Sequence, residues 1–279
     1  MAREHSAPAL TATPRSCPQC GSATGCDTGL TAAPWTIIAC DGCGFAYMTA
    51  AASYEDLAEA AAWSRSFHEE KKRRAERRPL FDWLDQRTRW RLHLLPRPET
   101  WKFTAEAVDA GTVVDIGCGA GGNLLRLGAG VTPIGIEIDR EQALKTDALL
   151  KERGGRCIAA PALEGLALFQ DDEIDAAMLN SFLEHETAPL PLLEALRRKL
   201  KPGGVAVLKT PNFASWNARV MKSAWCGIRI PDHVNYFTPA SMKEMAESAG
   251  FAVAFPRLAN LPTNDNFWTF LTKPLAAAQ

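Results

Sequence analysis

The sequence predicts an α/β fold built on a doubly wound parallel sheet, and two observations carry this prediction. Short apolar segments alternate with segments of helical spacing over residues 105–275, as in domains made of repeated strand–helix units. Several apolar segments end in an acidic or amide residue, and the carboxyl ends of parallel strands are where such sheets bind ligands. These endings are Asp115, Glu137, Asn180 and Asn212. A smaller, cysteine-bearing module precedes the sheet.

Composition excludes several classes of protein. At 279 residues, with 47% hydrophobic and 23% charged residues, the chain has the makeup of a globular protein with an ample core. The formal net charge of −1 favours neither nucleic acid nor an acidic membrane as a partner. No window is apolar enough for a membrane span, and residues 1–14 lack the apolar core of a signal peptide. We therefore expect a disordered tail at 1–14 and a cytoplasmic location.

Four of the eight cysteines form two C-x-x-C hooks, each followed by a glycine. Cys17 and Cys20 make the first hook, Cys40 and Cys43 make the second, and 19 residues separate the two. This spacing predicts tetrahedral zinc in a zinc ribbon at 15–48, with a strand before the second hook. A redox dithiol is the alternative, but it needs a βαβ setting that this segment lacks. Four thiolates leave no open position for catalysis, so we expect the zinc to be structural.

Residues 49–104 have helical spacing and many aromatic side chains, and we interpret them as a helical bridge between the two modules. The strongest basic run of the chain, KKRRAERR at 71–78, lies here with glutamates in and before it. Such a run is typical of a solvated helix face with local charge pairs. Two alternatives are a lid whose arginines meet a phosphate or carboxylate on the substrate, and a contact with nucleic acid.

The glycine-rich stretch VVDIGCGAGG, residues 113–122, is the most informative ligand motif. A strand that ends at Asp115 and turns through glycines leaves bare backbone where a ligand can approach. Glu137 ends the next strand 22 residues later, where a carboxylate can bind ribose hydroxyls. A dinucleotide also fits the glycine pattern, but Asp115 would oppose a pyrophosphate and suits the ammonium group of S-adenosylmethionine.

The remaining elements continue the alternation of strands and helices. They are expected as a short helix directly after the glycine loop, a helix at 141–153, strands at 156–159 and 174–179, a helix at 190–200 and a strand at 205–209.

The glycine loop resembles motif I of class I S-adenosylmethionine-dependent methyltransferases, with Glu137 at the acid of motif II. Further segments resemble the branch that includes ubiquinone-type O-methyltransferases and the zinc-ribbon-bearing methyltransferases of natural-product and sugar biosynthesis. These segments are LEH at 183–185, LKPGG at 200–204, TPN at 210–212 and the stretch at 232–251. The resemblance implies a Rossmann-like methyltransferase sheet of seven strands, the last one antiparallel, over residues 105–275.

The same resemblance implies a set of cofactor contacts. Asp115, Gly117 and Gly119 would contact the methionine part of S-adenosylmethionine, Glu137 the ribose and Asn180 the sulfonium side. The other candidate contacts are Cys118, Ile138, Ala162 and Leu163.

Two positions depart from the family pattern. Ala162 stands near the place where many relatives have an adenine-side acid. Ser181 stands where the ubiquinone-type enzymes have a glutamate that binds a metal, which argues against a catalytic metal.

Methyl transfer to oxygen or carbon usually needs a general base, and histidine is the common choice near neutral pH. His185, just past the fourth predicted strand, and His233, before the last predicted helix, are the candidates. Each of them can equally have only a structural role in its own loop. Asn212, Asn235 and Tyr236 are candidate substrate contacts.

We therefore predict an enzyme that transfers a methyl group from S-adenosylmethionine to a small-molecule acceptor in specialised, sugar or cofactor biosynthesis. The acceptor can carry a phosphate or a carboxylate, and a monomer or homodimer is expected without a membrane partner. One alternative is an RNA methyltransferase whose ribbon docks RNA, although the TPN and HVNYFTP segments fit small-molecule relatives better. The other is a non-catalytic adapter whose ribbon recruits partners.

Overall fold

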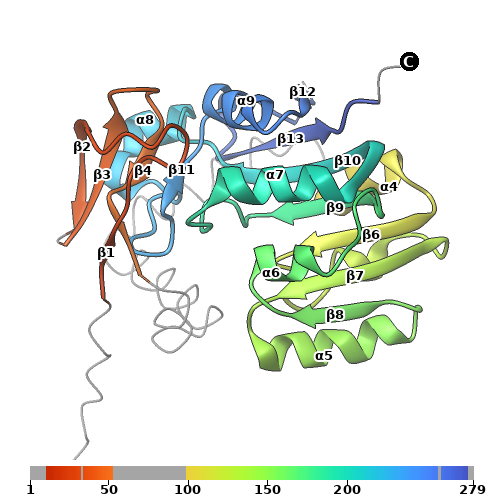
Figure 1. Cartoon of the computed structure of the whole chain (residues 1–279). Helices are drawn as coiled ribbons and strands as arrows, with labels where there is room; N and C mark the ends of the chain where they lie inside the picture. Colours follow the sequence, from red (N-terminus) through yellow and green to blue (C-terminus); the bar gives the residue numbers. More distant parts are fainter. Residues whose placement is uncertain (1–10, 33, 53–98, 257–258, 276–279) are drawn as a thin grey trace, which may run out of the picture.

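The structure is a computed structural model that describes residues 11–32, 34–52, 99–256 and 259–275 (Figure 1). Most of the predicted bridge at 49–104, including its basic run at 71–78, lies outside the described residues, as do residues 1–10 of the predicted tail. Within the described part of the chain, no helix is long and apolar enough to cross a membrane.

A seven-stranded sheet in the order β12-β13-β10-β9-β6-β7-β8 forms the larger body, and the α/β prediction is confirmed. The strands are β6 (Gly111–Ile116), β7 (Val131–Glu137), β8 (Arg156–Ala159), β9 (Ile174–Asn180), β10 (Leu200–Pro211), β12 (Ala252–Ala254) and β13 (Asn266–Thr272). β6 to β10 pair in parallel, whereas β13 is antiparallel to both of its neighbours, β10 and β12. The last strand is therefore antiparallel, as predicted.

Helices cover both faces of this sheet because its strands are apolar on both sides. On β9, Ala177 and Leu179 join one buried cluster, while Ala176 and Met178 join the cluster on the opposite face. The first cluster includes side chains of α6 (Ala162–Ala167), α7 (Pro189–Lys199) and α9 (Pro239–Ser248); the second includes those of α4 (Thr100–Ala107) and α5 (Arg140–Lys151).

The short helix predicted after the glycine loop is a single 3-10 turn, η1 (Leu124–Arg126). Gly121 and Gly122 precede this turn and Gly128 follows it, so too few good helix formers lie between the glycines to propagate a helix.

Two short elements complete the region before α9, namely α8 (Trp216–Met221) and η2 (Lys222–Ala224).

The N-terminal module is a small antiparallel sheet of order β11-β4-β3-β2. β2 (Gly25–Ala32), β3 (Trp35–Cys40) and β4 (Ala46–Met48) come from the predicted ribbon, whereas β11 (Asn235–Tyr236) comes from the methyltransferase part of the sequence. In Figure 1 the blue β11 lies beside the orange strands. A second pair, β1 (Thr13–Pro14) with β5 (Ala50–Ala51), places ordered strand inside the predicted tail.

The ribbon and the larger body share one hydrophobic core. The Phe45 ring packs edge-on against the Phe237 ring, with centroids 5.1 Å apart, and Tyr47 lies in the same buried cluster as Met242 and Met245 of α9. The parallel strands run toward the side of the molecule on which the ribbon lies (Figure 1). The ribbon is therefore packed near the sheet edge where ligands are expected.

Candidate active site and metal centre

The carboxyl ends of the parallel strands collect the predicted polar residues at one edge of the sheet. Asp115 is the penultimate residue of β6, Glu137 ends β7, Asn180 ends β9, and Asn212 directly follows β10. In the register of the sheet, Asp115 lies between Gly135 of β7 and Met178 of β9. Strand ends that are far apart in sequence therefore form one edge.

A pocket that is partly open to solvent lies at this edge. Its lining contains four of the predicted cofactor contacts, Gly117, Glu137, Ile138 and Ala162. It also contains residues that the sequence reasoning missed, which are Ile136, Ala160, Pro161 and Phe182. Phe182 could have been found from its position, because it comes two residues after the end of β9.

Backbone conformation explains the glycines of the loop. Gly117 has φ of +74°, and a Cβ placed there would lie 2.3 Å from the Phe182 ring, so only glycine fits. The Glu137 carboxylate accepts hydrogen bonds from the backbone N–H groups of Gly119 (2.9 Å) and Asp139 (3.0 Å). The predicted ribose-binding acid thus also holds the loop in place.

Asp115 has the environment of a ligand-binding carboxyl group. Its side chain is 1% exposed, and burial, with a smaller contribution from the Glu137 charge, raises its pKa to about 7. One carboxyl oxygen, Oδ1, is buried without a hydrogen-bond partner among the described residues. An unpaired buried acceptor two residues before Gly117 of this pocket suits the ammonium group of S-adenosylmethionine, and its contact with the cofactor stays a prediction.

The other predicted cofactor contacts are placed less directly. The Cys118 sulfur lies 3.6 Å from the sulfur of Cys157, and Asn180 Oδ1 accepts a hydrogen bond from the Thr100 hydroxyl at 2.8 Å. Leu163 is partly exposed on α6. Their contacts with the cofactor stay predictions.

The two candidate bases, predicted from separate motifs, lie together. The rings of His185 and His233 are nearly perpendicular, with centroids 4.6 Å apart, and both residues are buried. Nδ1 of His185 is 2.9 Å from the carbonyl oxygen of Asp232, and Nδ1 of His233 is 2.9 Å from that of Gly227. Since a carbonyl can only accept, each Nδ1 carries the proton and each Nε2 is the basic nitrogen.

Burial controls the ionisable groups around this histidine pair, which include Glu184 and the Arg229–Asp232 ion pair. Burial lowers the pKa of His185 to about 3, with a smaller lowering by the Arg229 charge, so the ring is neutral at pH 7. Burial raises the pKa of neighbouring Glu184 to about 8. Glu184, His185 and His233 bring a carboxyl oxygen and ring nitrogens within 4.8 Å of one another. At pH 7 the His185 ring is therefore neutral and the Glu184 carboxyl group holds its proton.

The three candidate substrate contacts are all buried. The side-chain amide of Asn235, 1% exposed, donates to the carbonyl oxygens of Leu183 (2.9 Å) and Glu186 (2.6 Å). Tyr236 packs in the ribbon core, and Asn212 Oδ1 accepts from the backbone N–H of Ala214 at 3.1 Å. These bonds give Asn235 and Asn212 structural roles, and their contacts with substrate stay predictions.

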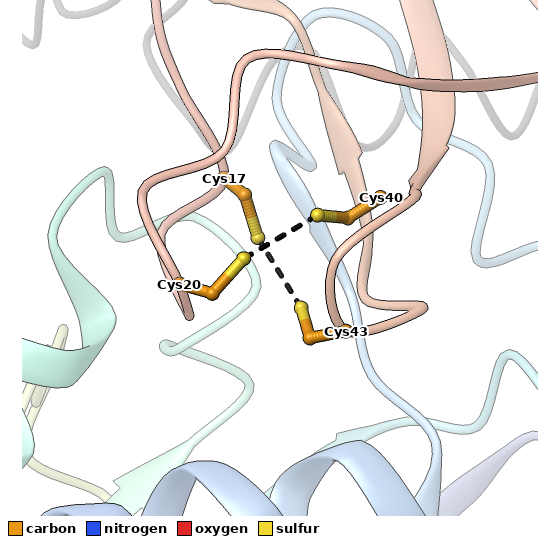
Figure 2. Close-up of side chains that lie close together, drawn as sticks. All are labelled: Cys17, Cys20, Cys40 and Cys43. Carbon is orange, nitrogen blue, oxygen red and sulfur yellow. Dashed lines mark hydrogen bonds between the residues drawn. The ribbon is translucent and has the colours of Figure 1, made fainter.

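The four cysteines of the hooks converge, as Figure 2 shows. The sulfurs of Cys17 and Cys43 are 3.6 Å apart, those of Cys20 and Cys40 are 3.5 Å apart, and all four lie within 4.8 Å of one another. A tetrahedral Zn²⁺ with Zn–S bonds of about 2.3 Å places its ligands roughly 3.8 Å apart. The donor set and its spacing therefore fit zinc.

The two hooks have the same backbone geometry. Gly21 N–H donates to the Cys17 carbonyl and Gly44 N–H to the Cys40 carbonyl, both at 2.8 Å, and both glycines have positive φ, +77° and +71°. Burial acts to raise the pKa of the Cys40 thiol, but hydrogen bonds from backbone amides and from neighbouring thiols outweigh it and lower the pKa to about 7. A thiol that ionises readily is suited to binding a metal.

Comparison with known proteins places this arrangement in a family. Residues 88–254, more than half of the chain, match the family described as "Methyltransferase domain". The chain belongs to this methyltransferase family. It is an S-adenosylmethionine-dependent methyltransferase, which is evidence against the non-catalytic adapter.

Individual relatives agree with this assignment. The chain is 29% identical to the ubiquinone biosynthesis O-methyltransferase of Thiobacillus denitrificans, over 60% of the chain and 77% of that protein. It is 34% identical to the enzyme of the same name from Psychrobacter arcticus, over 53% of the chain and 62% of that protein. The crystal structure of the YcgJ protein from Bacillus subtilis has the same fold, with a TM-score of 0.51 and 15% identity over 63% of the chain and 99% of that protein.

Proposed function

We propose that this methyltransferase acts on a hydroxyl oxygen of a small-molecule acceptor, with His185 or His233 as general base and with structural zinc in the ribbon. The observation that carries the proposal is the meeting of the two histidines, whose ring centroids are 4.6 Å apart. His185 comes three residues after Phe182 of the pocket lining, and His233 packs against His185. The names of the curated relatives, which are O-methyltransferases, favour oxygen as the acceptor atom.

On the cofactor side, the chain supplies binding and orientation. When bound, S-adenosylmethionine supplies an electrophilic methyl group on a positively charged sulfur. Asp115 would pair with the ammonium group of the methionine part, and Glu137 would accept hydrogen bonds from the ribose hydroxyls. The bare backbone at Gly117 allows close approach, and Phe182 would cover the cofactor and limit the access of water.

On the acceptor side, the task of the chain is to remove a proton. A hydroxyl group must lose its proton as its oxygen attacks the methyl carbon, so a neutral imidazole nitrogen within hydrogen-bond reach serves as base. The carbonyl of Asp232 fixes the tautomer of His185, and the carbonyl of Gly227 fixes that of His233. Each histidine therefore presents Nε2 as its proton acceptor.

The zinc would stabilise the ribbon. A ribbon sheet of this size has little core of its own, and four thiolate bonds to one ion would replace the missing burial. Four ligands leave no open coordination position, so we assign zinc no step in methyl transfer.

Methyl-labelled S-adenosylmethionine tests this proposal. Catechol and 3,4-dihydroxybenzoate serve as probe acceptors beside an extract of the source organism, and 3,4-dimethoxybenzoate serves as the matched control without free phenolic hydroxyls. The expected product carries the label as a methoxy group. Label found on nitrogen or carbon of the product from the extract would overturn the choice of oxygen.

His185→Gln and His233→Gln identify the base. Loss of the base should lower kcat by about 10²- to 10⁴-fold. The affinity for S-adenosylmethionine should stay unchanged in both variants, as measured by calorimetry. If neither variant slows turnover, the histidine pair is not the base.

A further inference from the structure

Arg15 connects three parts of the protein that are far apart in sequence. One guanidinium nitrogen, Nη1, donates to the carbonyl oxygen of Val234 at 3.0 Å. The other, Nη2, donates to the carbonyl oxygen of Thr187 at 2.9 Å and to Oδ1 of Asn235 at 3.0 Å. These acceptors are 172 to 220 residues away along the chain. Thr187 comes two residues after His185, and Val234 comes directly after His233.

The two histidine-bearing segments are also bonded to each other. The backbone N–H groups of Val234 and Asn235 both donate to the Glu184 carbonyl, at 2.9 and 3.0 Å. The amide nitrogen of Asn235 donates to the Leu183 and Glu186 carbonyls, so its Oδ1 is left to accept from Arg15. Arg15 thereby completes the hydrogen bonding of an amide whose orientation the two carbonyls already set.

The backbone of Arg15 belongs to the ribbon. It lies two residues before Cys17, its backbone N–H donates to the Thr49 carbonyl at 2.8 Å, and its guanidinium stands 5.9 Å from the centre of the Tyr47 ring. The Val234 carbonyl that accepts from Arg15 also accepts from the backbone N–H of Met48, at 2.9 Å. The Val234 carbonyl oxygen thus accepts two hydrogen bonds from the ribbon, one for each of its lone pairs.

We propose that Arg15 is a positioning residue that fixes the relative placement of the His185 and His233 segments, so that the zinc ribbon forms one wall of the acceptor side of the active site. This inference rests on the proposed function for its catalytic consequence. The planar guanidinium suits the task, because it holds several donors in a fixed plane and bonds several acceptors at once. A lysine at the same place presents a compact ammonium group on a flexible stem and cannot reproduce that plane.

A second arginine provides the matched control. Arg153 also donates to three oxygens, the carbonyls of Leu124 (3.0 Å), Leu127 (2.9 Å) and Gly128 (2.7 Å). These carbonyls lie in η1 and in the two residues after it, and α5, which ends two residues before Arg153, is remote from the ribbon in Figure 1. Arg153→Ala removes three bonds to backbone carbonyls, whereas Arg15→Ala removes two such bonds and the bond to Oδ1 of Asn235.

The experiment compares Arg15→Ala, Arg15→Lys and Arg153→Ala in the full-length, zinc-loaded protein. We expect Arg15→Ala to lower kcat with the probe catechol by about 10- to 100-fold, because a displacement of about 1 Å at a reacting group has an effect of this size. The Kd for S-adenosylmethionine should change by less than about twofold, since well-separated sites act independently. Arg15→Lys should recover part of kcat and guards against a variant that fails to fold. Arg153→Ala should weaken cofactor binding.

Long-range ¹H–¹⁵N spectra of the histidine rings give a readout that does not depend on turnover. In the wild type, His185 and His233 should each show one tautomer, protonated on Nδ1. In Arg15→Ala at least one of them should show mixed tautomers, whereas Arg153→Ala should leave both unchanged. Unaltered ring spectra in Arg15→Ala, or a loss of cofactor affinity as large as in Arg153→Ala, would overturn the inference.

The same data separate this inference from the proposed function. If His185→Gln and His233→Gln keep full turnover but Arg15→Ala still mixes the tautomers, the base assignment fails and Arg15 remains the residue that positions the pair. If the spectra stay unchanged while the histidine variants are inactive, the assignment of a histidine as base is supported and the positioning role of Arg15 is contradicted.

Discussion

The cofactor pocket and the histidine pair are built in different ways. Residues of the pocket follow consecutive strands of one sheet, and its loop is held by contacts that are close in sequence, such as the bond from Gly119 N–H to Glu137, 18 residues on. The histidine pair is assembled from two segments about 50 residues apart and is held by a ribbon from the other end of the chain. The pocket is locally encoded, whereas the histidine pair depends on the whole fold.

The two arginines show the same contrast. Arg153 bonds carbonyls 25 to 29 residues away and holds the turn η1, which follows the glycine loop, from within its own domain. Arg15 bonds acceptors 172 to 220 residues away and ties the ribbon to the histidine segments. We infer that damage to the ribbon should impair the acceptor side and leave the cofactor side largely intact. The following predictions test that separation.

Asp115→Asn should have the largest effect, and only on the cofactor side. Removing one partner of a buried charge pair costs about 2–5 kcal/mol, so the affinity for S-adenosylmethionine should fall by about 100-fold or more. Calorimetry measures this loss, with the exposed Asp109→Asn as control. Binding within about threefold of wild type would show that the buried Asp115 carboxyl group does not pair with the cofactor.

Loss of the ribbon metal should lower turnover and leave cofactor affinity nearly unchanged. Cys40→Ser, or removal of zinc by a chelator, should lower turnover by about 30- to 100-fold, because β11 and Arg15 lose their support. Cofactor affinity should stay within about threefold of wild type. Cys26→Ser is the control, since this exposed cysteine contacts Asp41 and lies outside the four-cysteine cluster. Metal analysis and calorimetry together decide the outcome, and an equal loss of cofactor binding would contradict the separation.

Gly117→Ala should lower the affinity for S-adenosylmethionine by about 10- to 30-fold. The added methyl group would lie 2.3 Å from Phe182 Cδ2, and the backbone has a positive φ of +74°, which strains any other residue. Gly122→Ala is the control because its Cβ would meet nothing within 4 Å. Because Phe182 itself lines the pocket, the double variant is compared with Phe182→Ala alone, and Gly117→Ala should cost less affinity in that background than in the wild type. An equal cost in both backgrounds would mean that backbone strain, and not the ring, causes the loss.

The pH dependence of cofactor binding should be the smallest of these effects. Burial raises the pKa of Asp115 to about 7, and the ammonium group of the cofactor requires the deprotonated form. Affinity should therefore be highest above pH 7 and fall by about tenfold between pH 8 and pH 6. Asp115→Asn should remove this dependence. A flat profile in the wild type would show that Asp115 already binds as a carboxylate at pH 6.

The stability of the cofactor-free protein should depend on pH in the opposite direction to cofactor affinity. Because the folded pKa of Asp115 is above its unfolded value, its contribution to stability is fully present below about pH 4 and is lost as the pH rises through about 7. Thermal unfolding without cofactor, compared between wild type and Asp115→Asn, measures this contribution.

Much of the larger body could be predicted because its signals are local. The strand expected at 156–159 coincides with β8, and the helix expected at 190–200 is α7, Pro189–Lys199, shifted by one residue. The short helix predicted after the glycine loop is only a 3-10 turn, because too few residues lie between the glycines to propagate an α-helix. Phe182 was missed because a single aromatic residue after a strand has no periodicity to mark it.

The ribbon shows where sequence patterns stop being informative. The spacing of its cysteines is enough to predict four converging thiols, which the structure brings within 4.8 Å of one another. No pattern marks β11, because a strand of two residues is too short for alternation to be visible. That Asn235 serves the ribbon sheet and bonds Arg15 follows only from its place in the fold.

The sequence by itself determined the cofactor side of this methyltransferase, because glycine spacing and strand-end acids are local and parallel strands must end at one edge. It also determined the cysteine cluster, since two short hooks with glycine turns carry their own geometry. Only the tertiary structure decided that the two histidines meet and that the ribbon is joined to them. The bonds that bring them together link residues up to 220 positions apart, and no local pattern encodes such pairings.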